Sequence, residues 1–354
     1  MKVARLYDVD DIRIEEEPIP RPGPGDALVK TVACGICTSD IMPWYVRRKA
    51  PVVLGHEPVG IIAEIGAAVR GFRRGDRVFV HHHAPCCECK HCRRGDYSLC
   101  ETWRRSKIIP GGIAEYFLVP ETNLATDTLL LPESVSFEDG VLIEPTACVV
   151  KSLRKAGLAP GDDAVPGSPP GARPDVKSLV VIGLGIMGQL HVLLGRTWGA
   201  HPIIGVEKIP QRIQIGRELG CDLVLNPLNE SVIEGVREIT RGELADIVIV
   251  GPGSREAVAL GLACAGRGSR IILFTPLPPG ETVEIEPFHL YMNEISLIPS
   301  YSCGPPDTRR ALELISAGII TARKLHLQSF PLHRTPEAFR AMAEARIVKA
   351  VITF

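Results

Sequence analysis

The sequence has few aromatic residues, almost no net charge and no long apolar run. Aromatic side chains make up 5% of the 354 residues, and 40 basic residues are balanced by 41 acidic ones, which leaves a formal net charge of −1. Nucleic acids and anionic membranes attract cationic proteins, so this balance argues against both as principal partners. No stretch approaches the about 18 uninterrupted apolar residues of a membrane span, and the first residues lack the apolar core of a signal peptide. We therefore expect a cytoplasmic protein.

Internal repeats, heptads and the features of a disulfide scaffold are also missing. The 11 cysteines are an odd number and five of them fall within residues 86–100, a distribution typical of metal binding. A segment rich in Pro and Gly, residues 160–174, is expected to be an exposed loop. At about 150 residues per domain, the length predicts two domains.

The pattern of short apolar runs changes along the chain and predicts two architectures. Residues 1–145 alternate β-like runs with turn signals, which is typical of an irregular barrel-like β domain. Residues 178–300 alternate apolar strands with helical stretches, which predicts a parallel sheet covered on both faces. The expected strands there are residues 178–183, 202–207, 222–226, 246–251, 269–275 and 294–300. The tail holds two helix candidates, residues 307–317 and 336–345, and a final strand, residues 349–354, that can return to the β domain.

Four of the clustered cysteines have the spacing CxxCxxCx7C, namely Cys86, Cys89, Cys92 and Cys100. Thiolates spaced in this way can converge on one Zn²⁺ and complete its tetrahedron, which predicts a structural zinc site without an open position. An iron–sulfur cluster fits the same thiolates, and unpaired surface cysteines are the remaining alternative. Cys87 interrupts the spacing and is expected to point away, although it can substitute for Cys86.

A mixed group of possible zinc ligands comes from Cys37, His56 and Glu144. One thiolate, one imidazole and one carboxylate bind zinc while leaving a position for water or substrate, as catalytic zinc sites do. A buried cysteine and a core histidine explain the same residues without a metal. The run His81-His82-His83 also resembles a metal site, but alternation along a strand would send neighbouring rings to opposite faces, so the three are not expected to share one ion.

A glycine fingerprint, GxGxxG, follows the apolar strand that ends at residue 182 and precedes a helical stretch. Its residues are Gly183, Gly185, Ile186, Met187 and Gly188. Such a turn brings backbone amides at a helix N-terminus to a pyrophosphate, which predicts a dinucleotide site. Glu207 closes the next strand, where a carboxylate accepts ribose hydroxyls and repels a 2′-phosphate, so NAD is favoured over NADP. The nearby cations Lys208 and Arg212 weaken that preference.

Taken together, these motifs resemble the zinc-dependent medium-chain dehydrogenase/reductase family of alcohol and polyol dehydrogenases. The resemblance covers nearly the whole chain and rests on residues 22–25 (PGPG), 37–40 (CTSD), 55–57 (GHE), 75–78 (GDRV), the four cysteines, 144–145 (EP) and 183–188 (GLGIMG). It implies an α/β plus β fold class, in which a Rossmann doubly wound parallel sheet domain, residues 148–300, is inserted into a GroES-like catalytic domain. The GroES-like domain would span residues 1–147 and 301–354, with a structural zinc lobe at 81–105. The family also implies two Zn²⁺ per chain, one catalytic and one structural, bound NAD, and a homodimer or homotetramer.

The resemblance assigns roles to individual residues. Cys37, His56 and Glu144 match catalytic zinc ligands, and Glu57 matches a residue that is a ligand in some branches and supports the ligands in others. The glutamate at position 144 is typical of the sorbitol and threonine dehydrogenase side of the family. Ser39 matches the hydroxyl that relays the substrate proton, with Asp40 as a supporting carboxylate. Many relatives place histidine where this chain has Met42, which cannot carry a proton.

These roles predict an oxidoreductase that moves a hydride between a secondary alcohol, a small molecule such as a polyol or sugar, and NAD. An L-threonine 3-dehydrogenase or a simple alcohol dehydrogenase is the alternative within the same chemistry. A zinc-free quinone or enoyl reductase keeps the fold but has no use for Cys37, His56 and Glu144. A non-catalytic protein that binds zinc and NAD for regulation is the alternative from another class. Nucleic-acid binding through the cysteine lobe is disfavoured by the neutral charge and the scarcity of aromatics.

Overall fold

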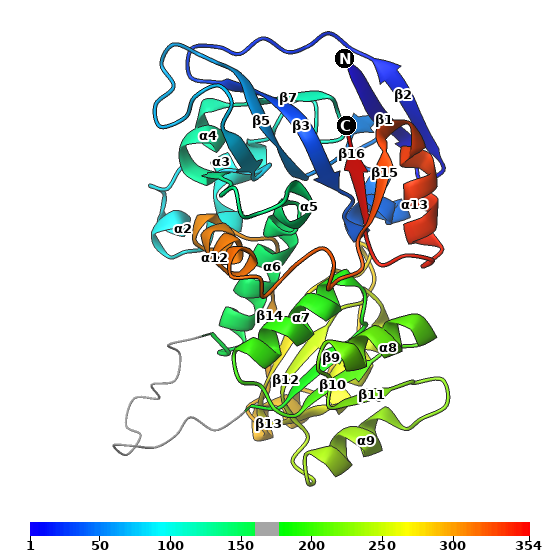
Figure 1. The fold of residues 1–354 in the computed structure, drawn as a ribbon. Helices are drawn as coiled ribbons and strands as arrows, with labels where there is room; N and C mark the ends of the chain where they lie inside the picture. The colour runs from blue at the N-terminus through cyan, green and yellow to red at the C-terminus, as the bar shows by residue number, and fades with distance from the viewer. Residues whose placement is uncertain (160–176) are drawn as a thin grey trace. The chain divides into compact units, whose positions relative to one another are not determined.

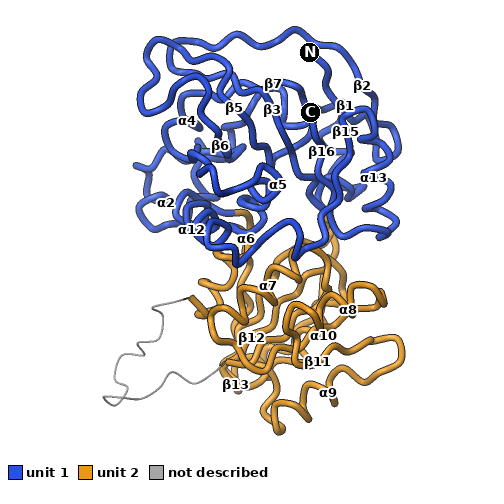
Figure 2. Tube along the Cα trace, in the orientation of Figure 1, with its two compact units in different colours: residues 1–147, 303–354 blue, residues 148–302 orange. Residues whose placement is uncertain are grey.

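The computed structural model describes residues 1–159 and 177–354, and the expected loop at 160–174 lies outside the described residues. The chain divides into two compact units (Figure 2). The first unit consists of Met1–Ala147 and Cys303–Phe354, and the second of Cys148–Ser302. The sequence placed these divisions at 147/148 and at 300/301. Among the described helices, none is both long enough and apolar enough to cross a membrane.

The first unit is built mainly from antiparallel strands. Its larger sheet has the order β15-β16-β3-β5-β6-β8, with β7 paired to β3, and its smaller sheet has the order β2-β1-β4. The strands are β1 (Lys2–Asp8), β2 (Asp11–Glu16), β3 (Ala27–Gly35), β4 (Val52–Val53), β5 (Glu57–Ile65), β6 (Arg77–Val80), β7 (Tyr116–Val119), β8 (Thr128–Leu130), β15 (Gln328–Pro331) and β16 (Ala350–Thr353). The helices are η1 (Thr38–Ile41), α1 (Pro43–Val46), α2 (Lys90–Arg93), η2 (Tyr97–Leu99), α3 (Glu101–Arg105), α4 (Glu121–Asp127), α5 (Phe137–Gly140), α12 (Pro305–Ser316), η3 (Leu332–Arg334) and α13 (Thr335–Ala343), and α6 (Ile143–Lys155) begins in this unit.

The C-terminal strand returns to the β domain. β16 runs antiparallel to β3, with Val351 opposite Gly35, and parallel to β15 (Figure 1). Ala350, Val351 and Ile352 are fully buried, because β16 has neighbours on both edges and packs into the core. This pairing brings the end of the chain beside the strand that leads to Cys37.

The second unit contains a six-stranded, fully parallel sheet with the order β11-β10-β9-β12-β13-β14. Its strands are β9 (Leu179–Ile182), β10 (Ile203–Val206), β11 (Leu223–Leu225), β12 (Ala245–Val250), β13 (Ala265–Leu273) and β14 (Ser296–Pro299), and its helices are α7 (Ile186–Thr197), α8 (Pro210–Glu218), α9 (Val232–Ile239), α10 (Arg255–Ala263) and α11 (Pro287–Met292). In chain order this is the 3-2-1-4-5-6 arrangement of a dinucleotide-binding sheet. The central strands β9 and β10 are buried along their whole length, as strands covered on both faces must be. The predicted Rossmann sheet is confirmed.

Candidate active site

The first donor set consists of Cys37, His56 and Glu57, whose ligand atoms lie within 4.8 Å of one another. Strand pairing brings these residues together. Gly35, the last residue of β3, pairs with Glu57, the first residue of β5, so the segment leaving β3 lies beside the segment entering β5. Cys37 then turns the chain as the N-terminal cap of η1.

Asp40 contacts both Cys37 and His56 of the first donor set. Its side chain is 1% exposed, and Oδ2 accepts the backbone N–H of Cys37 at 3.2 Å, while Oδ1 lies 3.7 Å from His56 Nδ1. Burial by itself lowers the pKa of His56, but the charges of Asp40 and Cys37 outweigh it, and the pKa is raised well above its usual value. A carboxylate behind an imidazole is the arrangement that orients metal-binding histidines.

Glu57 forms a buried ion pair with Lys349 from the beginning of the C-terminal strand. Their Oε2 and Nζ atoms lie 2.5 Å apart, both side chains are 1% exposed, and Nζ also donates to the carbonyl of Ile36 at 3.1 Å. Burial lowers the pKa of Lys349, but the neighbouring Glu57 raises it overall, so the lysine remains cationic. Gly35 makes room for the carboxylate, because a Cβ at this position would collide with Glu57 Oε2.

A second donor set consists of His81, His82 and Glu144, again with ligand atoms within 4.8 Å of one another. The three histidines do not form one donor set, in line with the expectation, but the premise that His81 and His82 face opposite ways is wrong here. β6 ends at Val80, so the alternation of a strand does not apply to the histidines that follow it. The His82 ring instead lies near both neighbours, with centroids 5.1 Å from His81 and 4.0 Å from His83. Glu144, in the first turn of α6, is 5% exposed and belongs to this set and not to the first.

Hydrogen bonds fix His81 in a buried network. Its Nδ1 lies 2.6 Å from Asp127 Oδ2, Thr308 donates to the other oxygen of Asp127 at 2.5 Å, and Nε2 lies 3.6 Å from Cys303 Sγ. Burial opposes protonation, but the charges of Cys303 and Asp127 raise the pKa of His81 overall. Burial and the neighbouring histidines lower the pKa of His82 well below its usual value, so this ring is neutral at pH 7.

The four cysteines of the lobe also converge. The Sγ atoms of Cys86 and Cys92 lie 3.9 Å apart, those of Cys89 and Cys92 3.6 Å, and those of Cys86 and Cys100 3.6 Å. Tetrahedral zinc with about 2.3 Å bonds to sulfur requires about 3.8 Å between thiolates, so the set fits one ion. Burial raises the pKa of Cys100, but the backbone N–H groups of Cys86 and Trp103 prevail and lower it to about 6. Cys87 is exposed with a φ of 61° and lies outside the set.

The glycine fingerprint forms a tight turn between β9 and α7. Gly183 has a φ of +84°, a conformation that favours glycine, and a Cβ at Gly188 would collide with the carbonyl oxygen of Gly183. Ile186 and Met187 open α7, so their amides face the turn as free helix N-terminal groups. This turn lies where the strand order reverses between β9 and β12, the usual place for ligands in such sheets.

Glu207, directly after β10, and Arg212, in the first turn of α8, both lie near this turn. Glu207 Oε2 accepts the N–H of Leu184 at 2.9 Å, and Oε1 accepts the N–H of Lys208 at 2.7 Å. Arg212 Nη1 lies 3.7 Å from where a Cβ would be placed on Gly185, and its Nε is buried without a hydrogen-bond partner among the described groups. A buried guanidinium nitrogen beside a glycine turn fits an anionic or polar ligand.

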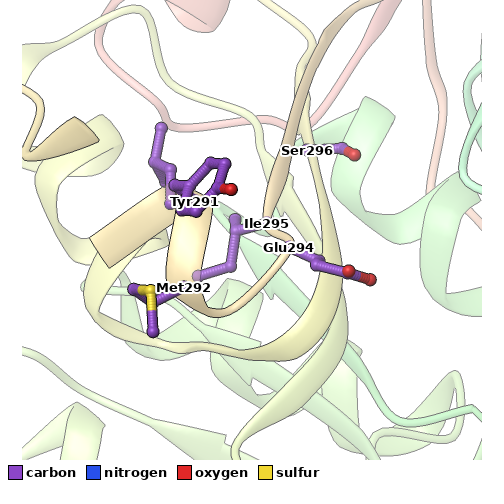
Figure 3. A pocket seen from close by; sticks show the side chains of 6 residues that line it. Tyr291, Met292, Glu294, Ile295 and Ser296 are labelled. Atoms are coloured by element: carbon purple, nitrogen blue, oxygen red, sulfur yellow. The ribbon is translucent and has the colours of Figure 1, made fainter. Parts of the chain in front are cut away.

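Ser39 and Met42 lie at opposite ends of η1. Ser39 is half-buried, and its carbonyl accepts the N–H of Met42 at 3.2 Å. The relay role of Ser39 stays a prediction. A separate shallow pocket lies between α11 and β14 of the second unit, and Figure 3 shows Tyr291, Met292 and Ile295 lining it. It contains no residue that the sequence predicted for a site.

Comparison with known proteins identifies the family. The model of the alcohol dehydrogenase GroES-like domain matches residues 23–131, and the model of the zinc-binding dehydrogenase matches residues 187–317. The L-threonine 3-dehydrogenase of Pyrococcus horikoshii is 32% identical over 291 residues, which cover 80% of this chain and 77% of that protein. The chain belongs to the zinc-dependent medium-chain dehydrogenases.

Alignments with further relatives cover nearly the whole length of this medium-chain dehydrogenase. Sorbitol dehydrogenase of Bacillus subtilis is 27% identical over 349 residues, covering 96% of this chain and 92% of that protein. A Sinorhizobium meliloti 1021 protein assigned to the zinc-binding dehydrogenases, and solved bound to NADP, matches with a TM-score of 0.85 at 29% identity. That match covers 100% of this chain and 99% of the other. The predicted fold class, a GroES-like domain with a Rossmann domain, and the predicted oxidoreductase class are confirmed.

The residues of this medium-chain dehydrogenase fit the metal that gives the family its name. Cys37, His56 and Glu57 supply the thiolate, imidazole and carboxylate donors that zinc accepts. Glu57 Oε1 is buried and has no hydrogen-bond partner in the part of the chain that the structure describes, as a ligand awaiting an ion would be. The cysteine lobe supplies four thiolates at tetrahedral spacing.

Three groups around these sites were missed from the sequence. Lys349, Asp127 and Thr308 come from distant elements and carry no motif. Lys349 gave one usable signal, since a lysine in the apolar run at residues 347–352 either ends a strand or is buried with a partner. Asp127 and Thr308 gave no signal in the sequence, because each lies in a helix without a recognisable motif.

Proposed function

We propose that this protein is an NAD-dependent zinc dehydrogenase that interconverts a secondary alcohol, such as a polyol, a sugar or a related compound, and its ketone. The observation that carries the proposal is the first donor set, in which Cys37, His56 and Glu57 come within 4.8 Å of one another. The relatives named sorbitol dehydrogenase and L-threonine 3-dehydrogenase support a vicinal diol or amino alcohol as substrate. Oxidation of L-threonine at its hydroxyl carbon is the second candidate.

Cys37, His56 and either Glu57 or Glu144 would hold the catalytic zinc. When bound, the ion supplies Lewis acidity that favours loss of the proton from an alcohol. Asp40 keeps the His56 ring in place, and the neighbouring Lys349 compensates the charge of Glu57 when that carboxylate is not a ligand. Ser39 is the proposed acceptor of the alcohol proton. Met42 cannot take the proton further, so we propose that it leaves through solvent or the ribose hydroxyls of the dinucleotide.

The dinucleotide site is proposed at Gly183, Gly185, Ile186, Met187 and Gly188. The nicotinamide ring, when bound, accepts the hydride from the carbinol carbon. The amides at the start of α7 would face the pyrophosphate, and the Glu207 carboxylate, turned from its present backbone partners, would accept the ribose hydroxyls. Residues 148–300 would thus act as the dinucleotide domain, and residues 1–147 with 301–354 as the catalytic domain.

NADP is the alternative cofactor, and two observations favour it. The Sinorhizobium relative was solved with NADP, and Arg212 has a buried Nε without a described partner, beside Lys208. Glu207 opposes it, because a 2′-phosphate beside a carboxylate is repelled. The two cofactors are distinguished by the ratio of the kcat/KM values for NAD and NADP, measured in the wild type and in Glu207→Ser. A higher kcat/KM for NADP than for NAD in the wild type would contradict the proposal that NAD is the cofactor.

The reaction is tested with a screen of NAD reduction over secondary alcohols, polyols and L-threonine, with and without a chelator. We expect turnover of polyols that is lost on chelation and in Cys37→Ser. Cys87→Ser is the matched control, because its thiol is exposed and outside both metal sets, and it should retain the wild-type rate. Full turnover in Cys37→Ser would contradict a zinc mechanism and favour a zinc-free reductase or a regulatory protein.

We further propose that Cys86, Cys89, Cys92 and Cys100 hold a structural zinc, so that the chain carries two ions. We also propose a cytoplasmic location, which the odd number of cysteines and their clustering in residues 86–100 support. We also propose a homodimer, with a homotetramer as the alternative. The outer edge of β14 has no partner strand in the described chain, and the adjacent α11 exposes Phe288, Tyr291 and Met292 by 69%, 81% and 60%.

A further inference from the structure

The second donor set has no part in the proposed reaction apart from Glu144. We propose that His81, His82 and Glu144 bind a second divalent transition-metal ion, beside the ion of the first donor set. No donor atom belongs to both sets, although the rings of His56 and His82 lie next to each other with centroids 4.8 Å apart. The proposal concerns metal binding and goes beyond the proposed function.

His81 is oriented as metal-binding histidines are. An ionised aspartate only accepts, so Nδ1 donates to Asp127 at 2.6 Å, and Thr308 holds the other oxygen of that carboxylate. This bond leaves Nε2, which lies 3.6 Å from Cys303 Sγ, as the nitrogen that can face an ion. A carboxylate behind the outer nitrogen fixes the ring and strengthens it as a ligand.

His82 brings the second, independent observation. Its Nδ1 is buried and has no hydrogen-bond partner among the described groups, which is costly for a polar atom unless something binds there. The backbone on which both rings stand is held firmly, since Asn123 Nδ2 donates to the carbonyls of His81 and His82 at 3.0 and 3.1 Å. The two imidazoles are therefore positioned before any ion arrives, which lowers the cost of binding.

The types of ligand indicate which ions fit. The set contains one carboxylate, that of Glu144, which is 5% exposed, while the buried carboxylates of Asp127, Asp40 and Glu57 face His81, His56 and Lys349. Two imidazoles and a carboxylate suit Zn²⁺, Fe²⁺ and Co²⁺ better than Ca²⁺ or Mg²⁺, which prefer oxygen ligands.

If the proposed function holds, an ion bound to the second donor set should inhibit the enzyme. Glu144 cannot serve the catalytic ion and the second ion fully at the same time. Excess zinc should therefore slow turnover of the wild-type enzyme, and the inhibition should disappear in His82→Phe.

Metal binding is tested directly by equilibrium dialysis of the zinc-loaded full chain against Co²⁺, with bound zinc and cobalt measured together. At saturation the wild type should hold one ion per chain more than His82→Phe. His83→Phe is the matched control, because it removes the adjacent imidazole, which binds the Ser106 carbonyl and lies outside the set, and it should hold as many ions as the wild type.

Equal saturation in the wild type and His82→Phe overturns the proposal. His82→Gln keeps a polar side chain without an imidazole, and it replaces His82→Phe if circular dichroism shows that variant to be misfolded. Cys37→Ser separates the two hypotheses. This variant should still bind the additional ion at His81, His82 and Glu144. Full activity in it would contradict the zinc mechanism but would not affect the proposal of a second metal site.

Discussion

Lys349 is a fully buried lysine whose charge is compensated by a single carboxylate, Glu57, at 2.5 Å. Removing one partner of such a pair leaves the other charge buried and unpaired, whereas removing both is nearly neutral. We expect Lys349→Met to lower the free energy of unfolding by about 3–5 kcal/mol, and the double variant Lys349→Met/Glu57→Gln to recover most of that loss. Urea-induced unfolding of the three proteins measures both values. A single variant as stable as the wild type would show that water or zinc already neutralises Glu57.

The buried His191 should make the free energy of unfolding depend on pH. The ring is fully buried, Nδ1 lies 2.7 Å from the Met187 carbonyl and Nε2 lies 2.6 Å from Ser152 Oγ, an arrangement that suits the neutral form. Burial, opposed by the Met187 carbonyl, lowers the pKa of His191 to about 4. In the unfolded chain the pKa is about 6.5, so between these values the unfolded state binds the proton and folding is penalised on acidification.

We therefore expect His191 to contribute a loss of unfolding free energy approaching 1.4 kcal/mol per pH unit as the pH falls from about 6.5 towards 4. Urea unfolding at pH 7 and pH 5 measures it, and the difference between the two should shrink in His191→Leu. An unaltered slope in His191→Leu would contradict a neutral buried ring.

At the scale of elements, the cysteine lobe has few apolar contacts of its own. Its helices α2, η2 and α3 have three to five residues each, and its buried cluster is Cys92, Cys100 and Trp103. Segments this short are unstable alone, so the proposed zinc would supply folding free energy to the lobe.

We expect Cys92→Ser to lose one zinc per chain and to expose Trp103, which is now 1% exposed. Metal analysis and acrylamide quenching of tryptophan fluorescence report the two effects. Cys87→Ser should show neither, because its exposed thiol is not part of the set. Retained zinc in Cys92→Ser would assign the ion to other ligands.

At the scale of the whole molecule, the surface of α11 and β14 predicts the assembly. Exposed strand edges beside exposed apolar side chains are aggregation hazards unless another chain covers them. We expect the wild type to be a dimer by light scattering, and Tyr291→Glu to shift it towards the monomer. Leu228→Glu is the matched control, because Leu228 is 72% exposed in the same unit but follows β11, at the opposite edge of the sheet from β14. A monomeric wild type would contradict this interface.

Local sequence determined the elements that can be recognised one at a time. The apolar runs of β9 and β12 and the glycine turn at Gly183 need only their neighbours in the chain, so the parallel sheet and the dinucleotide turn were predicted from pattern. The four lobe cysteines lie within fifteen positions, so their convergence followed from spacing alone.

Tertiary structure decided everything that depends on which distant groups become neighbours. Lys349 reaches Glu57 because β16 pairs with β3, and Asp127 reaches His81 because α4 ends beside the segment after β6, where strand alternation no longer applies. Glu144 lies with His81 and His82 for the same kind of reason. A sequence specifies donors through their chemistry, but burial and strand pairing determine which of them share an ion and which carry compensating charge.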